Sequence, residues 1–237
     1  MATDLVPLQV PSLKEACITR LEHLILSGEF KVGEELPSER KLAESLAVSR
    51  PVVHEALVDL AAKGLVTILP RKGVVVNDFR TTGSCALLAT LLDYHEGELD
   101  PRFMESLVAM RMLIEAETAR LAASHRTPED LARFAVLLAQ EADLDPRNVP
   151  ALAESAFFFH LQVALASGNL MYPLILNSFR GIYTNIAGKF FARNQGTPAA
   201  ERLLAFHRQL GEAIAEGDSQ AAADLMTAMI RHGAEHM

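Results

Sequence analysis

The segment over residues 36–64, LPSERKLAESLAVSRPVVHEALVDLAAKG, constrains the fold most narrowly. Apolar residues recur at helical spacing on both sides of the short stretch AVS, which predicts two helices joined by a tight turn. Ser38 and Ser49 stand at the expected N-caps, and Gly64 stands where a glycine ends a helix. Two helices joined by a turn of three or four residues form a helix-turn-helix.

The flanking sequence extends this motif on both sides. An amphipathic pattern over residues 12–29 predicts a helix before it. After it, the β-branched runs LVTI and GVVVND are bridged by LPRK, which predicts a β-hairpin. The order helix, helix, turn, helix, hairpin predicts a winged helix-turn-helix domain over residues 1–79.

The start of the second helix of the motif suits recognition of double-stranded DNA. In a helix-turn-helix this helix lies in the major groove and presents its first residues to base edges. Arg50 has the length and the paired donors for a bidentate contact with guanine, and Pro51 is tolerated because first-turn amides lack helical acceptors. Arg40 is placed for a backbone or base contact. Arg71 and Lys72 would reach DNA from the tip of the wing. Taken alone, Ser-Arg-Pro also fits an ordinary capped surface helix.

The overall charge does not oppose this interpretation. The chain is acidic, with a formal net charge of −8. Residues 36–77 nevertheless hold six Lys or Arg and four Asp or Glu, which gives this stretch a net charge of +2. The charge of the contact face matters more than the total, so the acidic composition is compatible with nucleic-acid binding.

Residues 35–76 resemble the winged helix-turn-helix of the GntR family of bacterial transcription regulators. The shared pattern is LPSER-x-LA, a V-S-R turn, an AL-x-x-L-x-x-x-GLV helix and a wing that ends in glycine. The resemblance covers residues 12–79 and implies operator DNA as a partner. It implies DNA contacts from the following residues: Arg40, Ser49, Arg50, His54, Arg71, Lys72 and Gly73. His54 stands where the family commonly has arginine, so its phosphate contact is expected to be weaker and pH-dependent.

The rest of the chain lacks strand patterns and predicts a second, all-helical domain over residues 85–237, after a linker at 80–84. Breakers such as GELDP, HRTPED and NQGTP separate six or seven amphipathic patterns. These patterns cover residues 83–95, 101–125, 127–143, 147–167, 171–193, 198–216 and 218–236. The predicted fold class is therefore mainly α, with the winged domain followed by a helical bundle.

The segment LVAMRMLIEAETARLAA (107–123) resembles the FadR-type subgroup of the same family, in which such a bundle binds a small effector. In that subgroup an arginine at the place of Arg111 projects into a central cavity, which implies contact with an anionic ligand. The residues themselves offer a simpler alternative. Glu115 lies four residues after Arg111, so the two side chains could form an ordinary helical ion pair.

Three kinds of effector site remain open, of which the first contains a divalent metal. Many members of the subgroup hold one with an aspartate and three histidines. His160 and His207 match two of these histidines, but Ala156 replaces the aspartate and His232 lies one turn beyond the last position. Zn or Ni is therefore not expected, and each histidine can equally be a core residue.

The second kind of site takes a long-chain acyl-CoA. LASGNLMYPLILNSFRGIYTNIAGKFFA (165–192) resembles the fatty-acid-responsive members of the subgroup, and Tyr183 matches a pocket tyrosine. Phe190 replaces a second tyrosine. The aromatic residues that could line such a cavity, or serve as ordinary bundle core, are Phe157, Phe158, Tyr183, Phe190 and Phe191. The third kind of site holds a small carboxylate or sugar acid at Arg111 without metal.

No nucleophile motif, phosphate-binding glycine loop or H-E-x-x-H pattern indicates an enzyme. A helical metal hydrolase at His160 and His207 is a remote alternative. The two cysteines lie in apolar helical patterns and are expected as buried or partly buried free thiols, as in the cytoplasm. No apolar run reaches about 18 residues, so no membrane-spanning helix is expected. A homodimer is predicted because operator recognition ordinarily uses two half-sites.

Overall fold

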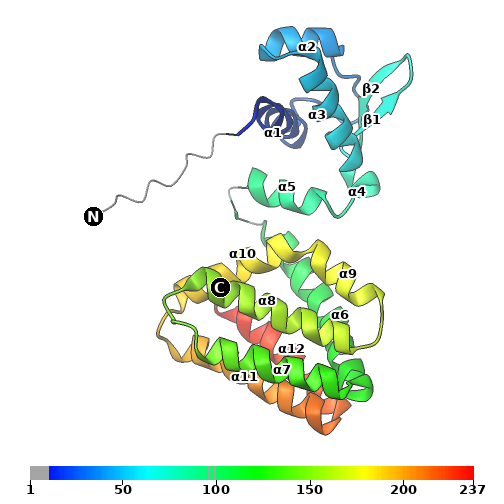
Figure 1. The fold of residues 1–237 in the computed structure, drawn as a ribbon. Helices are drawn as coiled ribbons and strands as arrows, with labels where there is room; N and C mark the ends of the chain where they lie inside the picture. Colours follow the sequence, from blue (N-terminus) through cyan, green and yellow to red (C-terminus); the bar gives the residue numbers. More distant parts are fainter. Residues whose placement is uncertain (1–10, 96, 99) are drawn as a thin grey trace. The chain divides into compact units, whose positions relative to one another are not determined.

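The computed structural model describes residues 11–95, 97–98 and 100–237, which form two compact units that divide between Glu96 and Gly97 (Figure 1). Helices dominate both units, and the one sheet among the described residues has two strands. This confirms the predicted fold class. The division lies later in the chain than the predicted linker at 80–84.

The N-terminal unit contains the predicted helices and hairpin in the predicted order. α1 packs against α3, and α3 packs against α2 around one apolar core that includes Leu21, Leu57 and Leu60. The elements are α1 (Leu13–Leu26), α2 (Glu39–Leu46), α3 (Arg50–Ala62), β1 (Val66–Leu69), β2 (Gly73–Val76), α4 (Phe79–Thr82) and α5 (Leu87–Tyr94).

The turn between α2 and α3 depends on a left-handed residue that sequence reasoning missed. Ala47 ends α2 at φ 53° and ψ 40°, a conformation that is costly for any residue with a Cβ atom. By contrast, Gly64 follows the C-cap of α3 at φ 82°, as predicted for a closing glycine. A Cβ atom at Gly64 would lie 2.1 Å from the carbonyl oxygen of Thr82, so the position requires glycine for space as well.

The segment predicted as a linker, residues 80–84, is hydrogen-bonded to the end of α3. Asn77 and Thr82 both donate hydrogen bonds to the carbonyl oxygen of Gly64, at 3.1 and 2.8 Å. Further along, Thr90 of α5 donates to the carboxylate of Glu22, which also pairs with Lys63 at 2.6 Å. Residues 77–94 are therefore part of the N-terminal unit and are held there by hydrogen bonds. Cys85 in this stretch is exposed, contrary to the prediction, because it precedes α5 rather than lying on its packed face.

The C-terminal unit is a bundle of seven helices among the described residues. α6 and α12 approach most extensively, and the alanines Ala119, Ala122 and Ala222 in the core permit this approach. The elements are α6 (Pro101–His125), α7 (Pro128–Ala142), α8 (Val149–Ala166), α9 (Met171–Ser178), α10 (Arg180–Arg193), α11 (Pro198–Glu216) and α12 (Ser219–Glu235).

Two details of the bundle differ from the predictions. The pattern at 171–193 predicted one helix, but the chain breaks at Phe179, which adopts φ −99° and ψ 4° between α9 and α10. Gly181, just beyond, weakens helical continuity here because glycine is a poor helix former. α8 is long and apolar enough to cross a membrane, contrary to the prediction, yet 56% of that stretch is buried inside the bundle. The apolar character of α8 therefore serves the core.

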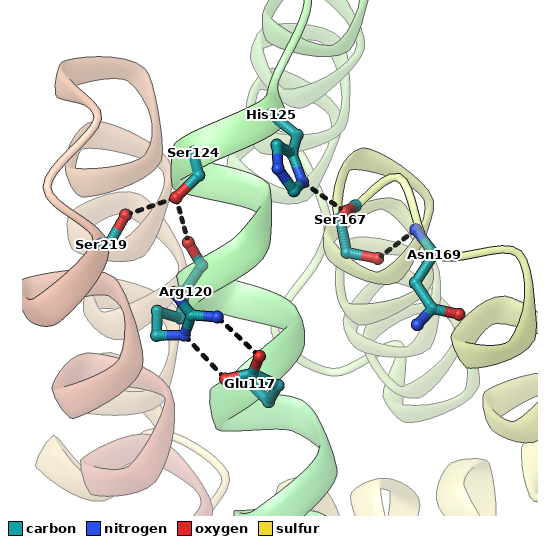
Figure 2. A network of polar contacts seen from close by, with 7 residues as sticks. All are labelled: Glu117, Arg120, Ser124, His125, Ser167, Asn169 and Ser219. Atoms are coloured by element: carbon teal, nitrogen blue, oxygen red, sulfur yellow. Dashed lines mark hydrogen bonds and ion pairs between the residues drawn. The ribbon is translucent and has the colours of Figure 1, made fainter.

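A polar network fixes one end of the bundle (Figure 2). At the end of α6, Ser124 lies 2.9 Å from Ser219 at the start of α12, and the ring of His125 bonds the carbonyl oxygen of Ser167 just after α8. One turn earlier, Arg120 forms a two-pronged contact with Glu117. The network joins three helices at the C-terminal end of α6, whereas the first turns of α6 line the cavity described below.

Candidate functional site

The first turn of α3 presents two cationic or titratable side chains to solvent. Arg50 and His54 lie one turn apart, and their side chains are 67% and 59% exposed. Both lie beside Glu39 of α2, whose carboxylate is 2.8 Å from His54 Nδ1 and 3.9 Å from an Arg50 nitrogen. Sequence reasoning missed Glu39, which orients both side chains while leaving them accessible.

The start of α3 leaves a hydroxyl group unused. Ser49 occupies the predicted N-cap position, but its side chain makes no capping hydrogen bond. Pro51 lies in the first turn, where its missing amide costs nothing. The free hydroxyl, the first-turn amides and the positive end of the helix dipole together suit a phosphate oxygen. On α2, Arg40 is exposed and pairs with Glu44 at 3.1 Å.

The hairpin carries two further cations at its tip. Pro70, Arg71 and Lys72 connect the strands, and Leu69 pairs with Gly73 at the base of this loop. Arg71 adopts φ 63° and Gly73 φ 116°, so the tip depends on two left-handed residues. Arg71 and Lys72 take part in none of the ion pairs recorded for the described residues. This leaves both charges to an external anion.

A cavity of about 50 Å³ lies between the helices of the bundle. Arg111 and Tyr183 line it, and both also line a smaller cavity of about 20 Å³. The wall is mainly apolar, with contributions from α6, α8, α10, α11 and α12. Its polar groups come from Arg111, His160, Tyr183 and His207. A cavity with a few convergent polar groups in an apolar wall is the usual form of a ligand site.

The charges in this wall are paired internally. Arg111 forms an ion pair with Glu115, and its guanidinium lies 4.3 Å from the centre of the Tyr183 ring. Burial opposes ionisation of Glu115, but the charge of Arg111, together with the contact from His160, overcomes it and holds the pKa of Glu115 at about 2. Burial alone would lower the pKa of Arg111, yet Glu115 raises it, so both groups stay charged.

His160 completes the buried cluster as a neutral partner. Its Nδ1 atom contacts the second carboxylate oxygen of Glu115. Burial lowers the pKa of His160 below its ordinary value even though Glu115 opposes the shift. At neutral pH the contact is therefore a hydrogen bond from a neutral imidazole to a carboxylate, and the charge on Glu115 is balanced by Arg111.

The structure corrects three of the five expected cavity residues. Tyr183 and Phe190 line the cavity, but Phe157, Phe158 and Phe191 do not. Phe157 and Phe191 are instead buried in the core of the bundle. Phe158 is 40% exposed, and the guanidinium of Arg180 lies over its ring. The three consecutive phenylalanines point in different directions on α8, because each residue turns the helix by about 100°. Phe157 is the one that packs against Tyr183, with ring centres 5.5 Å apart.

The histidines supply too few ligands for a metal. His160 and His207 have ring centres 5.6 Å apart, and each is oriented by a carboxylate, Glu115 and Glu141 respectively. Ala156 lines the cavity where a carboxylate ligand would be needed, and His232 is bonded to the carbonyl oxygen of Ala199. Within the described ranges no three His, Cys, Asp or Glu side chains are grouped for metal binding. Two imidazoles do not fit a zinc site, which ordinarily has at least three protein ligands.

Comparison with known proteins divides the chain in the same way. Residues 13–76 match the family described as bacterial regulatory proteins, gntR family, and residues 106–232 match the FCD domain. The regulator Mce2R of Mycobacterium tuberculosis is 34% identical over 228 residues, which cover 94% of this chain and 92% of that protein. The fatty acid metabolism regulator protein of Cronobacter sakazakii is 33% identical over 195 residues, which cover 81% of this chain and 77% of that protein.

One solved structure has a similar fold over nearly the full length of both chains. The Listeria monocytogenes protein Lar, described as controlling expression of the agr system, superposes with a TM-score of 0.65. The superposition covers 97% of this chain and 98% of Lar, at 18% sequence identity. At this identity the match supports the fold alone.

Proposed function

This chain belongs to the GntR family of DNA-binding transcription regulators and carries an FCD effector domain, and from this premise we propose that a long-chain acyl-CoA controls its affinity for operator DNA. In this proposal Arg50 contacts a base edge in the major groove. The DNA backbone or bases are also contacted by Ser49, His54 and Arg40. The wing contacts DNA through Arg71, Lys72 and Gly73. The protein acts as a cytoplasmic homodimer without catalytic activity, so that two copies of α3 read two half-sites.

The observation that carries the effector proposal is the mainly apolar cavity around Arg111 and Tyr183 in a chain related to fatty acid metabolism regulators. Arg111 and Tyr183 each line both the cavity of about 50 Å³ and the cavity of about 20 Å³. Rotation of these two side chains would join the cavities into a path for an acyl chain. Arg111 would then exchange its contact with Glu115 for a contact with the ligand.

A second candidate is a small carboxylate or sugar acid, and the cavity volume favours it. A space of about 50 Å³ holds only a few water-sized groups, so a long chain requires the bundle to open whereas a small acid does not. Its carboxylate would bind Arg111 in place of Glu115. We propose that neither ligand needs Zn or Ni, because only two of the histidines face the cavity.

A thermal-shift screen separates these candidates. The ligands are oleoyl-CoA, oleate, coenzyme A, succinate, and Zn or Ni ions. Oleoyl-CoA at one hundred times its Kd should raise the midpoint of thermal unfolding by about 5–10 °C. The reason is that ligand binding to the folded state adds about 2.7 kcal/mol to the free energy of unfolding. Stabilisation by succinate alone would replace acyl-CoA with the small acid, and stabilisation by metal alone would reject both metal-free sites.

A further inference from the structure

A second hollow lies beside the central cavity, on one face of α10. It has a volume of about 690 Å³ and shares Met104, Ile186 and Met237 with the cavity wall. Its polar lining comes from α10 and from the chain just before α6. An amphiphilic ligand that fills the cavity with its apolar part would therefore place its polar part here.

The α10 side of the hollow is polar and cationic. Asn185, Lys189 and Arg193 recur every four residues and lie on the same helix face. Arg193 takes part in none of the ion pairs of the described residues. The Oδ1 atom of Asn185 is buried without a hydrogen-bond partner, although buried polar atoms are normally paired. The hollow thus offers one uncommitted cation and one unused polar atom.

The other cation, Lys189, holds the start of the C-terminal unit. Its ammonium donates a hydrogen bond to the carbonyl oxygen of Gly97 and pairs with Glu98 at 2.8 Å. Gly97 is the first residue of this unit, so the hydrogen bond from Lys189 fixes the start of the C-terminal unit to α10. Glu98 is 81% exposed, and an ion pair this exposed is easily displaced by another anion.

We propose that this hollow binds the anionic head of the effector, and that Lys189 is a latch which the head opens by taking the ammonium from Gly97 and Glu98. A phosphate group carries more charge than the Glu98 carboxylate and therefore competes effectively for Lys189 and Arg193. Release of Gly97 then frees the first residue of the C-terminal unit from α10. This inference rests on the proposed function, because it assumes an effector in the neighbouring cavity.

Two substitutions test the latch because they should act in opposite directions. Glu98→Gln removes the internal competitor, and oleoyl-CoA should bind about two- to fivefold more tightly. Lys189→Met removes the cation, and oleoyl-CoA should bind about tenfold more weakly or worse, since a charge-assisted hydrogen bond is lost. Oleate, which carries no phosphate head, should bind both variants as it binds the wild type. Calorimetric titration measures these affinities.

Arg180→Met is the matched control. Arg180 is also a cation of α10 in an exposed ion pair, with Glu154 at 2.7 Å, but it does not line the hollow. The Arg180→Met variant should bind oleoyl-CoA with the same affinity as the wild type. Equal effects of the three variants, or changes of the same sign for Glu98→Gln and Lys189→Met, would reject the latch while leaving the effector proposal intact.

Hydrogen exchange provides a readout that needs no ligand. Peptides that begin at Gly97 should exchange faster in ligand-free Lys189→Met than in the wild type, and oleoyl-CoA should cause the same increase in the wild type alone. Unchanged exchange in the variant would overturn the latch. A wild-type protein that binds no acyl-CoA at all would instead overturn the proposed effector, and with it the assignment of the head.

Discussion

Arg50→Ala should abolish discrimination between the operator and unrelated DNA while leaving the protein folded. One bidentate contact with guanine contributes about 1–3 kcal/mol of base discrimination, and the proposed homodimer would lose the contact in both half-sites. The affinity for the operator should therefore fall by about thirtyfold to twenty-thousandfold. The measurement is fluorescence anisotropy at one fixed salt concentration, with a duplex that wild-type protein has selected from a random library.

Arg20→Ala is the control for this experiment. Arg20 is an exposed arginine of α1 in the same unit, so Arg20→Ala removes one positive charge, as Arg50→Ala does, but leaves α3 unchanged. It should lower affinity for all duplexes slightly and leave discrimination unchanged. If Arg50→Ala still prefers the selected duplex as strongly as the wild type, the assignment of α3 as the reading helix is wrong.

Arg111→Met should destabilise the helical bundle by about 3–5 kcal/mol, because it leaves the Glu115 carboxylate buried without its countercharge. In the wild type, burial and the charge of Arg111 both lower the pKa of His160, so removal of Arg111 favours protonation of His160 and offsets part of this loss. For a domain of this size the loss corresponds to a fall of about 6–20 °C in Tm. Urea unfolding at pH 7, followed by circular dichroism, measures the change in free energy.

The double variant Arg111→Met with Glu115→Gln identifies the cause of that loss. Glutamine keeps an acceptor for His160 Nδ1 but carries no charge, so much of the lost stability should return. A double variant that is as unstable as Arg111→Met, or less stable, would show that the packing of Arg111 on Tyr183 matters and the buried charge does not.

Features of the fold that depend on local chemistry were predictable from the sequence. Gly64 signals the end of α3 because a left-handed residue is needed there, and glycine adopts that conformation without cost. The hairpin is marked by β-branched residues on both sides of a short loop. Ala47 adopts the same left-handed conformation in the turn before α3, and nothing in its side chain signals it.

Features that depend on tertiary contacts were not predictable. Glu39 reads as a routine first-turn acid, and its position beside Arg50 and His54 follows only from the packing of α2 on α3. Phe157 and Phe158 were equal candidates for the cavity wall, yet the orientation of α8 decides that Phe157 is buried and Phe158 exposed. Lys189 lies 91 residues from Glu98 in sequence, so their ion pair has no local signal.

The measurement that tests the central claim most directly is the coupling between operator and effector. Operator affinity is titrated with and without saturating oleoyl-CoA, and oleoyl-CoA affinity is titrated with and without operator. Each ligand should weaken binding of the other by the same factor, about 5- to 150-fold, because coupling free energy is reciprocal. Binding of oleoyl-CoA that leaves operator affinity unchanged would contradict the proposed coupling.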